Sequence, residues 1–199
     1  MKTRLAILSM VALCLIAAPA MADMYGTVDV TYQGFTSTAS VTVYTYGTAI
    51  GTVTGMATLD LSNPMSVPAG WVPYLTGTGI ESWCIDLGDY ASSLGVTLNY
   101  DVASLDATPD PWAGPMGDTR ARYLAELLDE NWKAGMTALQ KQALQLAVWE
   151  VVDESRNNTT DPKSVGYSLN IMAGNFYAAT TTTGLLAAAQ AMLDNIGTG

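Results

Sequence analysis

Cys84 is the residue whose chemistry stands out first, because it is the only cysteine left once an amino-terminal segment is removed. The other cysteine, Cys14, lies in that segment. A single cysteine cannot form an internal disulfide, so in a secreted protein its thiol is free, linked to another molecule or reactive. The thiolate is the nucleophilic form of this side chain. The plainer alternative is an inert residue that packs as a small hydrophobe.

The absence of histidine narrows the chemistry further. Histidine is the usual general base of hydrolases and the commonest zinc ligand, so Ser-His-Asp, Cys-His and zinc-protease sites are excluded. A calcium site at Asp86 and Asp89 stays open as an alternative, although no full ligand loop is present. A glycosidase would need a carboxylate pair, and none is marked out. We therefore expect no enzyme, no metal and no cofactor.

The segment 81–90 around Cys84 alternates as a strand does. With a period of two, the large apolar side chains share one face, and Cys84 shares the other with Asp86. The apolar side chains are those of Trp83, Ile85 and Leu87. They are expected to fill the sheet core, so Cys84 is expected to face whatever covers the opposite side of the sheet.

The segment 137–154 is predicted to be a helix, because Thr137 and Gln140 have the spacing of a capping box and no Gly or Pro follows. Apolar residues cover most of its circumference, which is typical of a buried central helix. The predicted core residues are Leu139, Leu144, Leu146, Val148 and Val151. The remaining polar wedge holds Lys141, Gln142, Gln145 and Asp153. Gln145 then lies on a partly covered face, one turn before Trp149.

Together, Trp83-Cys84-Ile85-Asp86-Leu87 and Leu144-Gln145-Leu146-Ala147-Val148-Trp149 resemble the two signature motifs of the thioester domains of bacterial surface adhesins. The pair of motifs is also similar to that of secreted bacterial proteins with a Pro-Glu-Pro carboxy-terminal sorting signal, whose tail does not occur here. The resemblance covers roughly residues 80–155. It implies that the side chains of Cys84 and Gln145 join in an internal thioester that captures nucleophiles, with Trp149, Trp83 and Asp86 in support.

Two functions follow as expectations. The first is a secreted surface or matrix adhesion protein, not an enzyme, whose partner is a surface or matrix protein or a polysaccharide. The second is a non-reactive structural or carbohydrate-binding extracellular β-protein in which Cys84 is a buried free thiol and Gln145 is a satisfied buried amide.

The first 22 residues are read as a secretory signal peptide. Lys2 and Arg4 precede an apolar run too short to span a bilayer, and a small-residue site ends at Ala22. Their removal leaves six basic against eighteen acidic residues, a net charge of −12. So acidic a chain is a poor ligand for nucleic acid or an anionic membrane. We expect a secreted or cell-surface protein with no membrane insertion in the mature chain.

The predicted fold is α+β, a β-sandwich or barrel with an inserted or appended helical hairpin. Residues 23 to about 100 are rich in Thr, Val and Tyr between glycines, which favours strands. The helical hairpin is expected at about 118–155, a strand at 165–172 and a last helix at 185–193. Residues 23–199 are expected to form a single domain.

Overall fold

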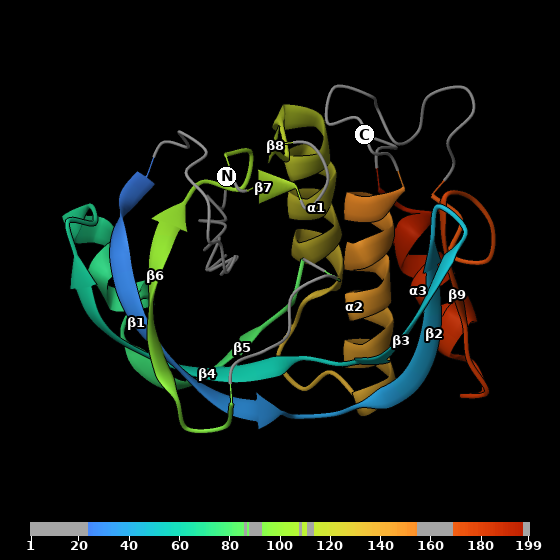
Figure 1. The fold of residues 1–199 in the computed structure, drawn as a ribbon, viewed down its shortest axis with the longest axis horizontal. Coiled ribbons are helices and arrows are strands. Elements are labelled where there is room, and N and C mark those ends of the chain that lie inside the picture. The colour runs from blue at the N-terminus through green and yellow to red at the C-terminus, as the bar shows by residue number, and fades with distance from the viewer. Residues whose placement is uncertain are drawn as a thin grey trace, which may run out of the picture.

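The computed structural model describes residues 24–85, 87, 93–107, 109–110, 114–154 and 169–196, and its fold is α+β (Figure 1). The strands are β1 (Met24–Phe35), β2 (Ala39–Thr45), β3 (Thr48–Thr54), β4 (Ala57–Met65), β5 (Gly77–Ser82), β6 (Thr97–Ala103), β7 (Pro109–Asp110), β8 (Gly114–Pro115) and β9 (Phe176–Ala179). The helices are the 3-10 helix η1 (Ala69–Tyr74) and the α-helices α1 (Asp118–Asn131), α2 (Ala138–Asp153) and α3 (Leu185–Leu193). The predicted signal peptide 1–22 and Asp86 lie outside the described residues.

The predicted class and the predicted helical hairpin are confirmed. One antiparallel sheet has the strand order β5-β4-β1-β6 and a second has the order β3-β2-β9, while β7 and β8 pair separately. The described strands form open sheets, which are compatible with the sandwich alternative and do not close into a barrel. α1 and α2 form the hairpin, and α3 lies where the last helix is expected.

A single long ribbon of two strands joins the sheets. β1 continues into β2, a tight turn reverses the chain, and β3 continues into β4 alongside. Tyr46 and Gly47 make the turn with φ of 49° and 80°, the positive pair that a type I′ hairpin turn requires. The ribbon sweeps under the helices from one sheet to the other (Figure 1).

The ribbon bends where β1 gives way to β2. There the Thr36 N–H donates to the Met56 carbonyl at 2.9 Å, so the two chains stay paired through the bend. Gly55 crosses so close to Ser37 that a Cβ on it would lie 1.8 Å from the Ser37 carbonyl oxygen. Only glycine therefore fits at this point of the bend.

α2 is the central helix and is buried from Gln142 to Asp153 without a break. It contacts α1, α3, β3 and β9, so neighbours surround its whole circumference. This confirms the prediction of a buried central helix, with Leu144, Leu146, Val148 and Val151 in the core. Leu139, near its start, is only half-buried. The face of Gln145, predicted to be partly covered, is buried, as are Gln142 and Asp153 of the same polar wedge.

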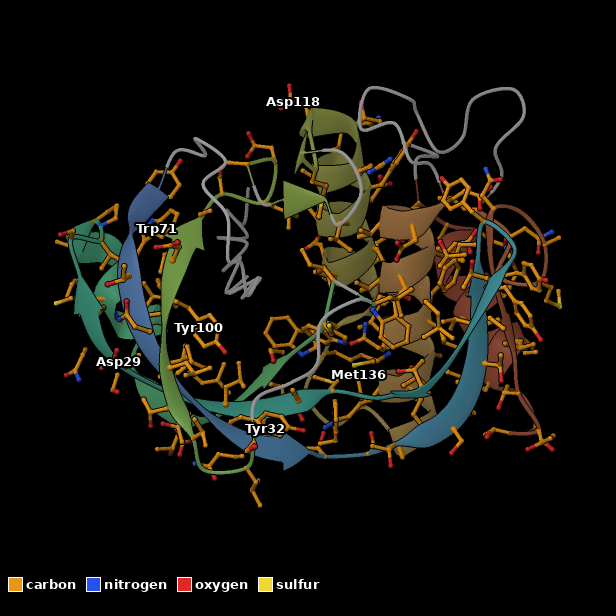
Figure 2. The ribbon with its side chains drawn as sticks, viewed as in Figure 1. Asp29, Tyr32, Trp71, Tyr100, Asp118 and Met136 are labelled. Atoms are coloured by element: carbon orange, nitrogen blue, oxygen red, sulfur yellow. The ribbon has the colours of Figure 1, made fainter. Side chains whose placement is uncertain are left out.

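A second, smaller core lies on the four-stranded sheet. Figure 2 shows Tyr100 and Asp29 on opposite faces of that sheet. The apolar face carries the buried residues Val28, Val30, Leu59, Leu61, Leu75, Tyr100 and Val102. The other face is polar: Asn63 and Asn99 each donate to the exposed carboxylate of Asp29 at 2.8 Å. This is the alternation expected of a sheet with one solvated face.

Two predicted strands are wrong. β5 ends at Ser82, so Trp83, Cys84 and Ile85 are not in a strand. The reason is the loss of a partner: Ser82 pairs with Ala57, the first residue of β4, and the bend lies immediately before it. The described part of 165–172, residues 169–172, is likewise not a strand. The last strand is β9, which pairs with β2.

Among the described residues, no helix combines the length and the hydropathy that a bilayer crossing demands.

Candidate functional site

The side chain of Gln145 lies on the backbone of Cys84. The Cys84 N–H donates to Gln145 Oε1 at 3.0 Å, and Gln145 Nε2 donates to the Cys84 carbonyl oxygen at 2.6 Å. Gln145 is only 1% exposed, so water does not compete for these bonds. The structure thus brings together the two residues that the sequence singled out, although 61 positions separate them.

This contact explains how the chain after β5 is held. Beyond Ser82, residues 83–85 pair with no strand in the part of the chain that the structure describes, and buried N–H and C=O groups need partners. The Gln145 carboxamide offers one acceptor and one donor side by side, as an adjacent strand would. It therefore fixes Cys84 against α2 at the position where the sheet stops.

The orientation of α2 is set at its start. The Thr137 side chain accepts from the Gln140 N–H at 3.3 Å, and Gln140 Oε1 accepts from the Thr137 N–H at 2.9 Å. This is the predicted capping box, and it fixes the residue at which the helix begins. Gln145 and Trp149 then follow at one-turn intervals.

The Cys84 side chain is half-buried against the main core. Trp83, Trp132 and Trp149 belong to or pack on the same core. Trp83 meets Trp132 edge to face, with ring centroids 5.3 Å apart. The ring nitrogens of Trp83 and Trp149 are buried and have no hydrogen-bond partner among the described residues. The core on which Cys84 packs is thus rich in indole rings.

The electrostatics of the Gln145 amide are those of a polarised carbonyl. The Cys84 N–H points at Oε1, the atom on which negative charge develops when a nucleophile attacks the amide carbon. The amide nitrogen, which would be the leaving group, is held on the Cys84 carbonyl. These two bonds place the Gln145 carboxamide beside the backbone of the residue that carries the thiol.

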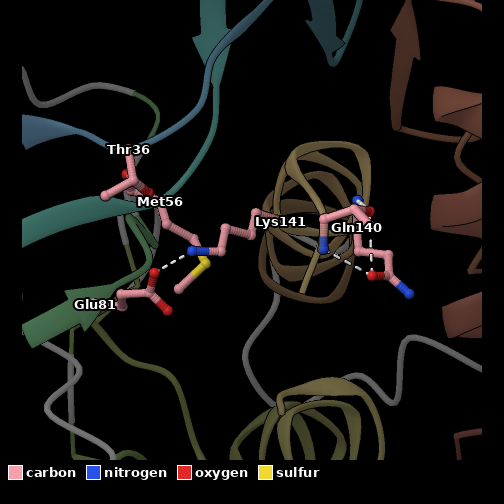
Figure 3. Close-up of polar contacts among 6 residues, drawn as sticks. Thr36, Met56, Glu81, Gln140 and Lys141 are labelled. Atoms are coloured by element: carbon pink, nitrogen blue, oxygen red, sulfur yellow. Dashed lines mark hydrogen bonds and ion pairs between the residues drawn. The ribbon is translucent and has the colours of Figure 1, made fainter. Parts of the chain in front are cut away.

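A second attachment between the same two segments was missed by sequence reasoning. The Lys141 ammonium forms an ion pair and hydrogen bond with the Glu81 carboxylate (Figure 3). Lys141 precedes Gln145 by four residues, and Glu81 precedes Cys84 by three. The available sequence signal was a charged residue three or four positions before Cys84 and before Gln145, with opposite signs. This signal predicts an ion pair only if the two segments are known to be neighbours.

Three buried carboxylates gather at the carboxyl end of α2: Glu150, Asp153 and Glu154. Glu150 Oε1 accepts from the Asn170 N–H at 2.7 Å, and Glu154 Oε2 accepts from the Phe176 N–H at 3.0 Å. Burial, with the neighbouring Glu154 charge next in effect, raises the pKa of Glu150 to about 9 against the opposing Asn170 hydrogen bond. Glu150 is therefore a neutral acid at pH 7.

These carboxylates serve the fold. Glu150 and Glu154 accept from backbone N–H groups of the chain that leads into and begins β9. The Tyr46 hydroxyl donates to the backbone carbonyl of Glu154 at 3.4 Å. Within the described part of the chain, no cluster of three or more acidic, cysteine or histidine side chains has the arrangement of a metal site. Asp86 and Asp89, the calcium alternative, lie outside the described residues.

Comparison with protein-family models, with curated proteins and with solved structures gives no match to this chain. The family resemblance therefore rests on the two motifs, and the function rests on the geometry at Cys84 and Gln145.

Proposed function

We propose that this protein is a secreted surface or matrix adhesion protein in which Cys84 and Gln145 form an internal thioester. The observation that supports it is the double hydrogen bond between the Gln145 carboxamide and the Cys84 backbone. It presents the amide to the residue that bears the thiol, on a buried helix whose position is fixed from all sides.

Formation of the bond is an acyl transfer. The Cys84 thiolate attacks Cδ of Gln145, and the oxygen of the tetrahedral intermediate keeps the Cys84 N–H as its donor. The Cδ–Nε2 bond then breaks while the Sγ–Cδ bond persists. The amide nitrogen leaves as ammonia and takes the proton that the thiol gave up. No oxidant or cofactor is consumed.

Capture of a partner breaks the thioester again. The thioester is an electrophile, and an amine or hydroxyl of a surface protein or polysaccharide attacks Cδ of Gln145. The new amide or ester bond joins the partner to Gln145, and the nucleophile's proton returns to the Cys84 sulfur. Burial of Gln145, which is 1% exposed, limits competing attack by water.

Intact mass tests the proposal. Freshly purified, amine-free protein should be one ammonia lighter than its sequence mass, and methylamine should add to Gln145 and release one titratable thiol. Because Gln145 contacts only the backbone of residue 84 in these bonds, Cys84→Ser should keep the fold and abolish labelling. Gln142→Ala, on the same helix, is the matched control and should label normally. A wild-type protein of full mass with a reactive thiol would overturn the proposal.

A second candidate is a non-reactive extracellular binding module. It is favoured by the fact that both polar atoms of Gln145 are already satisfied, as in a purely structural contact. Its binding face would be η1, where Trp71 and Tyr74 are 37% and 43% exposed and Tyr25 packs on Trp71 (Figure 2). Polysaccharide binding lost in Trp71→Ala, but kept in the exposed-leucine control Leu94→Ala, together with full wild-type mass, would select this function.

A further inference from the structure

We propose that Lys141 and Glu81 are a positioning pair that keeps the Cys84 thiol at the Gln145 carboxamide while the thioester forms. This inference rests on the proposed thioester and names two residues beyond its motifs. Neither residue touches the reacting atoms in the contacts described, so their role is positional.

Lys141 and Gln145 attach the same segment to the same side of α2. Residues four apart on a helix lie on the same face one turn apart, so Lys141 and Gln145 point to the same side of α2. Both reach the short segment from Glu81 to Cys84. Two contacts one turn apart fix the register and the angle of that segment on the helix, whereas one contact would leave it free to pivot.

The Lys141–Glu81 ion pair is partly buried. The side chains of Lys141 and Glu81 are 17% and 30% exposed, so solvent screens their attraction less than it screens that of a surface pair. Figure 3 shows the Lys141 side chain extending from α2 to the Glu81 carboxylate. The pair therefore links the helix directly to β5.

One contact between Gln145 and Cys84 does not survive the reaction. The hydrogen bond from Gln145 Nε2 to the Cys84 carbonyl is lost when that nitrogen leaves as ammonia. In the described part of the chain, no strand pairs with residues 83–85 to replace it. Over the bond-breaking step, the Lys141–Glu81 ion pair and the remaining Cys84 N–H bond to Gln145 Oε1 together hold the segment against α2.

The experiment compares the rate of ammonia loss, followed by intact mass, in freshly refolded wild type and four variants. Lys141→Met and Glu81→Gln each keep the shape of the side chain and remove its charge. We expect each to slow thioester formation roughly ten- to hundredfold, the effect of a misplaced reacting group. The double variant Glu81→Lys with Lys141→Glu restores opposite charges and should recover most of the rate. Lys133→Met, at an exposed lysine before α2, should form the thioester as wild type does.

Melting temperatures of the same variants separate position from stability. Lys141→Met is expected to melt within a few degrees of Lys133→Met while forming the thioester far more slowly. Equal rates in these two variants, or no recovery in the charge-swapped double variant, would overturn the positioning pair and leave the thioester standing. Full sequence mass in the wild type would overturn the thioester, and the pair's role in it.

Discussion

The side chain of Gln145 completes the sheet at Cys84. It accepts from the Cys84 N–H at 3.0 Å and donates to the Cys84 carbonyl at 2.6 Å, immediately beyond the last residue that β4 can pair. A helix side chain thus occupies the place of a neighbouring strand. The same two bonds hold an amide beside a thiol-bearing residue, so the structural contact and the proposed chemistry share one geometry.

This relationship separates the two members of the pair in their effect on stability. Gln145→Ala leaves the Cys84 N–H and C=O without their partners and should lower the free energy of unfolding by about 1–3 kcal/mol. Cys84→Ser, compared with wild type whose thioester has been opened with methylamine, should change it by less than about 1 kcal/mol, because the backbone bonds remain. Urea melts measure both, and equal losses would contradict the backbone pairing.

Truncation of the central helix should be costly. Leu146 is completely buried, so Leu146→Ala should lower the free energy of unfolding by about 2–5 kcal/mol. The matched control is Lys133→Ala, which should be nearly neutral because Lys133 is exposed. Lys141→Ala is not a neutral control, since it removes a half-buried ion pair. If urea melts gave Leu146→Ala and Lys133→Ala free energies of unfolding within about 0.5 kcal/mol of wild type, α2 would lie at the surface.

Glu150 predicts a pH dependence of stability. Its pKa is about 9 in the folded protein and near 4.5 in the unfolded chain, so between these values the folded state binds the extra proton. Stability from this group is therefore full below about pH 4.5 and declines as the pH rises toward 9. Glu150→Gln keeps an acceptor for Asn170 without a charge to bury. Relative to wild type, the variant should therefore gain more stability at pH 8 than at pH 5.

Melting temperatures of wild type and Glu150→Gln at pH 5 and pH 8 check the sign. Titrating groups that do not interact with Glu150, such as Asp29, whose pKa is lowered by hydrogen bonds from Asn63 and then Asn99, affect both proteins alike. They cancel in the comparison. A difference between the two proteins that does not grow with pH would contradict the raised pKa of Glu150.

The bend of the ribbon should depend on one glycine. Gly55→Ala would place a Cβ against the Ser37 carbonyl oxygen and should lower the free energy of unfolding by more than about 3 kcal/mol. Gly51→Ala, in the neighbouring strand β3, is the control: nothing lies within 4 Å of its Cβ, so it should be neutral or slightly stabilising. Urea melts of the two variants make the comparison, and similar values would argue against a tight bend.

The sequence by itself determined what is local in this protein. The capping box at Thr137 and Gln140, the apolar run of α2 and the helix at 185–193 depend on residues within a few positions, so period and capping predict them. The strand-rich first half follows from the same kind of local preference. Burial of α2 was predicted from its composition, and burial of the Gln145 amide was one of two alternatives, whereas burial of Gln142 and Asp153 was not predicted.

Only the tertiary structure decided where the strand at Cys84 ends and what replaces its partner. A strand exists as long as a neighbour pairs with it, and the neighbour β4 starts at Ala57 because the ribbon bends at Gly55. That bend is set by a close approach to Ser37, eighteen residues away along the chain. The contacts of Gln145 with Cys84 and of Lys141 with Glu81 span about sixty residues. The two motifs indicated the first pair of residues but not its backbone hydrogen bonds, and no local pattern indicated the second. Both contacts arise because packing around α2 brings the end of β5 against one face of the helix.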